Sequence, residues 1–462
     1  MLIHGVVFVS FLAGALALVP FFHLFEEQPK NAGTSRAGEP LFLTPYIQKG
    51  QLDEAKKLAK VGPIDGDASI PSFSGLLTVN ESMESNMFFW FFPAANDPSN
   101  APVSLWLEGG PGVTALFGVF VENGPYKVIP EQMIQERSKS WHKLSNMIYI
   151  DSPVGTGYSF TKRTEGFART EDDVARDLYE ALRQFFTLFN EYSKNDFYIM
   201  GESYAGKFGP ALAYAIHKDK QTKIRLTGLV VGDGYCDPAT MLDYASFLEK
   251  IALVNRRQAS AMQVLQNDIA KAIKKGEFKA AAAGALTLAD AIRAFIKPGG
   301  GFIYNFLRDE TPTRFTRFVK FAQTDETRLA LHVGNLNFDD SSNLVRLNLG
   351  DDFMRSVKPI ITELMEHYKV LMYSGQLDVI VAASLTASFI DSIQWSGAKE
   401  LAEADRIVWK DLQTGYPAGY VRRVKNFTEV FVRDAGHTVI FDRPQRAYDM
   451  IKRFLTDKPF GE

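Results

Sequence analysis

Residues 196–206 read DFYIMGESYAG. Four apolar residues, too few for a helix and rich in strand formers, lead into Gly-Glu-Ser-Tyr-Ala-Gly, and a helical pattern follows at 208–216. A serine at such a turn is a nucleophile elbow, because small neighbours let the backbone bend until the hydroxyl stands clear of the sheet. Gly201 and Ala205 occupy the two small positions. The stretch therefore predicts Ser203 as a nucleophile, with an ordinary strand-to-helix loop and a capping serine as the alternative.

Strand and helix patterns alternate on both sides of this turn. An amphipathic helix at 170–192 precedes it, and from 237 to 346 the alternation gives way to helical patterns alone. This order predicts an α/β fold with a mostly parallel central sheet and helices on both faces. Strand patterns stand at 74–79, 87–93, 103–107, 147–150, 196–200, 226–231, 369–373 and 429–432.

The N-terminal residues predict export. Residues 6–19 form an uninterrupted apolar and small run with alanines near its end, which is typical of a signal peptide. An uncleaved membrane anchor is the alternative, because 21–25 extend the apolar run towards the membrane-spanning length of about 20 residues. The sequons at Asn80 and Asn426 are predicted glycosylation sites and suit the secretory pathway.

The chain is predicted to divide into five consecutive parts. The predicted parts are a signal peptide at 1–19, an N-terminal arm at 20–72, the first part of the core at 73–236, a helical lid insertion at 237–346 and the second part of the core at 347–462.

Composition and charge are ordinary for a globular protein. The 462 residues carry a net charge of -3, and the basic residues form no long run, so nothing favours nucleic acid as a partner. Cys236 is the only cysteine, which excludes an intramolecular disulfide. Neither an H-E-x-x-H motif nor a phosphate loop occurs, so no metal and no cofactor are predicted.

A nucleophilic serine needs a base and an acid that orients that base. In this architecture the chain order is serine, acid, histidine. Among the seven histidines, His437 follows a late strand, in the loop 434–437 before the last helix. Asp378, which closes the segment 370–378, is the predicted acid. Asp233, which follows an earlier strand, is the alternative acid.

Backbone N–H groups complete the predicted chemistry. An oxyanion hole takes one donor from the residue after the nucleophile, here Tyr204, and another from a glycine-rich loop after an early strand. The loop at 109–112 follows the strand pattern at 103–107, so Gly110 is predicted as the second donor.

The chain resembles the serine carboxypeptidases, and within them the vitellogenic-like carboxypeptidases, from about residue 38 to its end. The resemblance implies an α/β-hydrolase fold with a helical lid, and release of single residues from the C-terminus of peptides through an acyl-enzyme. It rests on GEPLFLTPY (38–46), FFWFFPA (88–94), WLEGGPG (106–112), DSPVGTG (151–157), GESYAG (201–206), GDGYCDP (232–238), GQLD (375–378) and AGH (435–437).

The resemblance also implies a site for the free carboxylate of the substrate. Trp106, Glu108 and Gly109 belong to one loop of this site, and Glu122 and Glu202 supply two further acids. Two close carboxyls cannot both ionise cheaply, so one keeps a proton and donates it to the substrate, which favours binding at acidic pH. Glu108 stands where the family has Asn or Gln, so an amide donor becomes a third acid.

The predicted partner is a peptide with a free C-terminal carboxylate, without nucleic acid and without a stable membrane anchor. The predicted location is the secretory pathway, either secreted or lysosomal, and the resemblance allows a homodimer. An acyltransferase or esterase on the same fold is one alternative, because an acyl-enzyme can pass its acyl group to an alcohol. A catalytically inactive binding protein is the other, because a fold does not determine a function.

Overall fold

The computed structural model describes residues 35–64, 70–296 and 302–461. The predicted signal peptide, and the membrane anchor that is its alternative, lie outside these residues. Among the helices described, none combines the length and the apolar character needed to cross a membrane. The division of the chain into an arm, a core and a lid stays a prediction.

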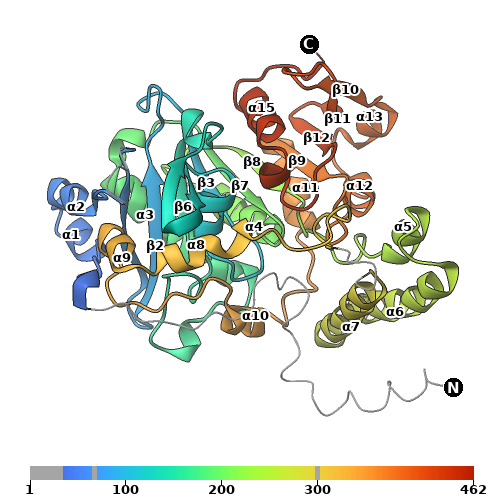
Figure 1. Ribbon diagram of the computed structural model, residues 1–462, viewed down its shortest axis with the longest axis horizontal. Helices are drawn as coiled ribbons and strands as arrows, with labels where there is room; N and C mark the ends of the chain where they lie inside the picture. The colour runs from blue at the N-terminus through green and yellow to red at the C-terminus, as the bar shows by residue number, and fades with distance from the viewer. Residues whose placement is uncertain (1–34, 65–69, 297–301, 462) are drawn as a thin grey trace.

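A ten-stranded sheet forms the centre of the molecule (Figure 1). Strands β6, β3, β7, β8, β9 and β12 run parallel to one another, and antiparallel strands flank them at both edges. In sheet order the strands are β1 (Phe73–Asn80), β2 (Ser85–Phe92), β6 (Asn146–Ile150), β3 (Val103–Leu107), β7 (Phe197–Glu202), β8 (Leu226–Gly232), β9 (Lys369–Gly375), β12 (Phe427–Val432), β11 (Pro417–Val424) and β10 (Ile407–Lys410).

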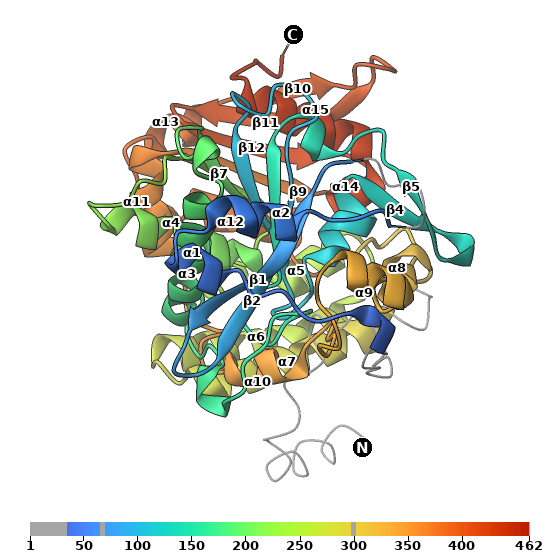
Figure 2. The same ribbon diagram turned by 90° about the vertical axis from the view of Figure 1, so that its left-hand side faces the viewer.

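Helices cover both faces of the sheet, which confirms the predicted α/β-hydrolase fold. In Figure 2, α3 (Glu171–Leu188), α4 (Ala205–Lys218) and α11 (Lys358–His367) lie on one side. The β4–β5 hairpin, α8 and α14 lie on the other. The remaining elements are α1 (Thr44–Gln48), α2 (Leu52–Ala59), β4 (Tyr126–Ile129), β5 (Met133–Glu136), α8 (Arg314–Ala322), α9 (Asp325–Ala330), α12 (Ala383–Asp391), α13 (Ala398–Glu403), α14 (Val439–Asp442) and α15 (Pro444–Leu455).

In the stretch between β8 and β9 that the sequence predicts as helical, the described residues form helices joined by loops and contribute no strand to the sheet. Figure 1 shows α5, α6 and α7 extending away from the sheet. They are α5 (Tyr244–Lys250), α6 (Arg256–Lys274) and α7 (Phe278–Ile296), and α10 (Asn343–Asn348) follows later in the same stretch. The first turns of α7 are rich in alanine, which favours a helix without marking an apolar face.

Two features of the fold are not predicted by the sequence patterns. The edge strand β10 and its inner neighbour β11 lack the apolar run of a buried strand: three residues of β10 are exposed and Trp409 is its one buried residue. Helix α3 ends at Leu188, before the predicted end, and a short 3-10 turn at Asn190–Tyr192 follows. Its start is as predicted, because Thr170 and Asp173 form a reciprocal capping box.

A buried cation anchors the helix that follows the elbow. Lys207 on α4 is completely buried, and its Nζ donates to the carbonyl oxygens of Asp352 at 2.8 Å and Phe353 at 3.2 Å. The Asp352 carboxylate lies 3.6 Å away and the Glu171 carboxylate 3.9 Å away. Burial raises the pKa of Glu171 to about 8. The network ties α4 to the start of α3 and to the segment before α11.

Replacing Lys207 with alanine should therefore destabilise the whole core. We expect the free energy of unfolding to fall by about 3 kcal/mol, because the buried Asp352 carboxylate and two carbonyl oxygens lose their cation. Urea denaturation of the parent and of Lys207→Ala measures this difference. An unchanged midpoint would show that the ion network contributes nothing to stability.

Candidate active site

Ser203 lies at a strained turn between β7 and α4. Its φ angle is 59°, in the left-handed region that non-glycine residues seldom adopt. The turn needs small neighbours: a Cβ atom on Gly201 would stand 2.6 Å from the Cβ of Ala205. The Ser203 N–H donates to the Gly232 carbonyl at 2.9 Å. The turn therefore has the geometry predicted for a nucleophile elbow.

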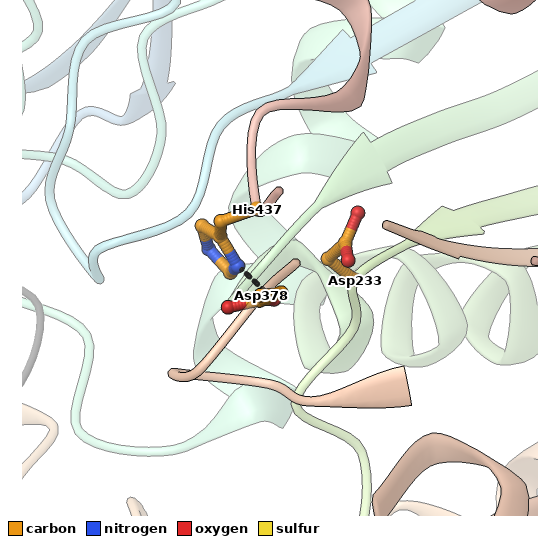
Figure 3. A group of neighbouring side chains, drawn as sticks. All are labelled: Asp233, Asp378 and His437. Carbon is orange, nitrogen blue, oxygen red and sulfur yellow. Dashed lines mark hydrogen bonds and ion pairs between the residues drawn. The ribbon is translucent and has the colours of Figure 1, made fainter. Parts of the chain in front are cut away.

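His437 and Asp378 meet at the same end of the sheet, in the loops after β12 and β9. The Nδ1 atom of His437 lies 2.7 Å from Oδ2 of Asp378, and the Ile380 N–H donates to Oδ1 at 2.7 Å. Both side chains are buried. Of the two acids considered from sequence, Asp378 is the one bonded to the histidine, and Asp233 lies beside the pair (Figure 3).

The other ring nitrogen of His437 has no hydrogen-bond partner among the described residues. Ser203 and His437 line the same cavity, which has a volume of about 30 Å³. A base whose Nδ1 is held by an acid and whose Nε2 shares a cavity with a serine hydroxyl can accept the serine proton. Such hydrogen bonds are often long in free enzymes and shorten when substrate binds.

The glycine-rich loop after β3 packs directly against the elbow. A Cβ atom on Gly109 would stand 2.6 Å from the Ser203 Cβ and 2.8 Å from the Tyr204 backbone nitrogen. Gly110 has a φ of 112°, which side-chain-bearing residues rarely adopt. In the part of the chain that the structure describes, no acceptor takes a hydrogen bond from the N–H of Gly110 or Tyr204. Both donors remain available for a substrate oxyanion.

Three buried acids lie next to the serine. Glu108, Glu122 and Glu202 each place a carboxyl oxygen within 4.8 Å of the other two, and all three are buried. Two of them, Glu108 and Glu202, line the cavity that holds Ser203. Their residue types and spacing would also suit a cation, but proton sharing among the acids explains the cluster without one.

Burial is the main cause of the unusual titration of these acids. It raises the pKa of Glu122 to about 8. Burial also raises the pKa of Glu108 and of Glu202 well above the ordinary range, and the charge of Glu122 raises both further. Trp106 opposes this for Glu108, because its Nε1–H donates to Glu108 Oε1 at 2.6 Å. The cluster therefore carries protons at acidic and neutral pH.

Tyr304 is a site residue that the sequence patterns do not predict. Its carbonyl accepts the His437 N–H at 2.6 Å, and its ring meets the imidazole edge to face with 4.7 Å between centroids. It also lines the cavity of Ser203. Tyr304 lies in the helical stretch after β8, far from the elbow, the acid and the histidine in sequence, and no local motif marks it.

The two predicted glycosylation sites lie in turns of the sheet. Asn80 ends β1 at the turn into β2 and is half-buried, and its Oδ1 accepts from the Ser82 hydroxyl at 2.8 Å. Asn426 lies in the turn between β11 and β12 and is exposed. Glycosylation of either asparagine stays a prediction.

Comparisons with known proteins place the chain in a family. A family model described as serine carboxypeptidase matches residues 63–457. The human probable serine carboxypeptidase CPVL is 45% identical over 91% of this chain and 90% of its own length. The vitellogenic carboxypeptidase of Aedes aegypti is 40% identical over 92% of this chain and 91% of its own. The crystal structure of Kex1(delta)p, a prohormone-processing carboxypeptidase from Saccharomyces cerevisiae, matches the fold with a TM-score of 0.78 and 22% identity, covering 87% of this chain and 96% of that one.

The fold comparison agrees with the α/β-hydrolase architecture, and the family model spans the elbow, the acid and the histidine. The chain belongs to the serine carboxypeptidase family.

Proposed function

We propose that this serine-type carboxypeptidase releases single residues from the free C-terminus of peptides through an acyl-enzyme, most effectively at acidic pH. Ser203 is the nucleophile, His437 is the general base and acid, and Asp378 orients the imidazole. The observation that carries this proposal is the shared cavity. It joins the serine and the histidine to two acids whose protonated forms suit a substrate carboxylate.

The geometry supports the following acylation. The Ser203 Oγ attacks the carbonyl carbon of the last peptide bond, and its proton passes to Nε2 of His437. The N–H groups of Gly110 and Tyr204 hold the negative oxygen. The C–N bond then breaks as Nε2 returns the proton to the leaving amino group. Water repeats the sequence on the acyl-enzyme and regenerates the free serine.

Recognition of the C-terminus rests on the buried acids. Glu122 and Glu202, kept protonated by burial, donate hydrogen bonds to the substrate carboxylate, and the loop of Trp106, Glu108 and Gly109 forms the facing wall. Affinity is present while these carboxyls are neutral. The affinity for the substrate carboxylate is lost as the pH rises through the raised pKa values of these acids. For Glu122 the pKa is about 8.

The proposal is tested with a blocked dipeptide and its C-terminal amide, assayed from about pH 4 to about pH 10, a range that spans the titration of the imidazole and of the buried carboxyls, whose pKa values are raised. We expect release of the last residue from the free acid only, fading towards high pH. Equal turnover of the acid and the amide, or of an ester lacking a carboxylate, would favour the acyltransferase or esterase alternative.

Glu108 sets part of the pH dependence, and its substitution with glutamine should flatten it. We expect similar KM values for the parent and Glu108→Gln at acidic pH. At the alkaline end of the pH profile, where the Glu108 carboxyl ionises in the parent, the variant's KM should be lower by up to about tenfold, because one carboxylate that repels the substrate can no longer form. Asp177→Asn, which removes a buried carboxyl on α3, is the control. If KM depends on pH in the same way in the parent and in Glu108→Gln, Glu108 does not contribute to recognition of the substrate carboxylate.

We extend the proposal to the protein's location and partners. The apolar N-terminal run and the two sequons favour the secretory pathway, with secretion or lysosomal delivery as the destination and glycans on Asn80 and Asn426. Peptides with a free C-terminus are the proposed substrates, and a homodimer is the proposed assembly. Recovery of the protein from the medium tests secretion, intact-mass analysis before and after deglycosylation tests the glycans, and light scattering tests the homodimer.

A further inference from the structure

Asp233 is a buried acid beside the catalytic base, and the mechanism above gives it no role. It follows β8, at the same end of the sheet as Asp378 after β9 and His437 after β12. One carboxyl oxygen of each aspartate and one ring nitrogen of His437 lie within 4.8 Å of one another. Figure 3 shows the three side chains brought together from three separate segments. Asp233 and Asp378 are completely buried.

Of the four carboxyl oxygens of Asp233 and Asp378, one lacks a hydrogen-bond partner among the described residues. Oδ1 of Asp233 accepts from the Gly375 N–H at 2.8 Å. Asp378 accepts from the Ile380 N–H through Oδ1 and from His437 through Oδ2, each at 2.7 Å. Oδ2 of Asp233 has no partner among residues 35–64, 70–296 and 302–461, although it is buried. Two carboxylates cannot donate to each other, whereas one proton on Oδ2 gives it a partner in Asp378.

We propose that Asp233 is a neutral carboxylic acid that donates a hydrogen bond to the Asp378 carboxylate and thereby limits the basicity of His437. It is a positioning residue, and the inference rests on the proposed role of His437 as the base. The proton withdraws part of the negative charge that Asp378 presents to the imidazolium, so His437 loses its own proton at a lower pH. An enzyme that works at acidic pH needs its base neutral there.

The groups that face Asp233 favour its neutral form. Burial raises the pKa of Asp233 well above its ordinary value, and the charge of Asp378 raises it further. His437, when protonated, is the cation within the cluster, and the neighbouring acid Asp442 is already paired with Arg308 at 2.7 Å. The other titratable groups that face it are Asp442 on α14, Glu202 on β7 and Tyr373 on β9.

A purely structural role in the turn is the competing explanation. Asp233 has a φ of 41°, and its N–H donates to the Tyr373 carbonyl at 2.7 Å. Aspartate and asparagine are both favoured in this conformation. If Asp233 only shapes the turn, its substitution changes stability but leaves the titration of the His437 ring where it was.

The test is the titration of the His437 ring by NMR in the parent, Asp233→Asn and Asp233→Ala. Asparagine places an amide donor where the acid proton stood, so we expect an unchanged midpoint. Alanine removes the donor, so we expect the midpoint to rise by about one pH unit. If both substitutions lower the midpoint, Asp233 is ionised in the parent and the proposal is overturned. An unchanged midpoint in Asp233→Ala overturns it as well.

Three controls make the result independent of folding and of activity. His437→Gln identifies the resonance, and Asp177→Asn shows the effect of neutralising a buried acid elsewhere. Should Asp233→Ala not fold, Asp233→Gly removes the same donor with a backbone suited to a positive φ. Titration does not require turnover, so loss of organophosphate labelling at Ser203 would refute the proposed function without touching this measurement. Where Ser203 does react with the organophosphate, the pH dependence of the labelling rate should shift together with the titration midpoint of the His437 ring.

Discussion

Replacing Ser203 with alanine is expected to lower kcat/KM for a blocked dipeptide by about 10⁴- to 10⁶-fold. In the proposed mechanism the hydroxyl at the elbow is the atom that attacks, and without it only the residual catalysis of the oxyanion donors and of substrate binding remains. The same substitution should abolish covalent labelling by an organophosphate. Binding of a peptide with a free C-terminus should persist, because the three buried acids are unchanged.

Release of the terminal residue by Ser203→Ala at the parental rate would exclude the serine mechanism. Thermal melting of the variant is the necessary control. We expect its melting temperature to match that of the parent, because the substitution removes only the contacts of the hydroxyl group. Absence of both turnover and labelling in the parent itself would favour the inactive binding protein considered from the sequence.

Replacing Asp378 with asparagine is expected to lower kcat by about 10⁴-fold with little change in KM. The Asp378 carboxylate accepts from Nδ1 of His437 at 2.7 Å, which leaves Nε2 free to accept the serine proton. An amide at this position donates instead, which places the ring proton on Nε2 and removes the base. Stopped-flow release of the leaving group from an ester substrate measures the loss in acylation.

The matched variant is Asp233→Asn, which neutralises the neighbouring acid in the same shell of side chains. We expect its kcat to stay within about threefold of the parent, because an amide donor serves Asp378 as the acid proton does. If Asp233 were the catalytic acid, the two effects would be exchanged. The pair of variants therefore decides between the two acids by function as well as by geometry.

The sequence by itself was sufficient for features that depend on local sterics and periodicity. The turn at Ser203 follows from the small residues Gly201 and Ala205, and strand β3 runs over the residues that its apolar pattern predicts. The order of serine, acid and histidine also predicted the pair His437 and Asp378 that the structure joins. Resemblance to a family, supported by the comparisons, extended this to the enzyme class.

Only the tertiary structure decided which side chains far apart in the chain touch. The strand order of the sheet places β8, β9 and β12 side by side, which brings Asp233 next to Asp378 and His437. This strand order cannot be read from the spacing of residues along the chain. Packing buries Glu108, Glu122 and Glu202 together, and desolvation, which depends on burial alone, is what raises their pKa values. Tyr304 reaches His437 for the same reason: local sequence governs how a segment bends, whereas the packing of the whole chain governs what it meets.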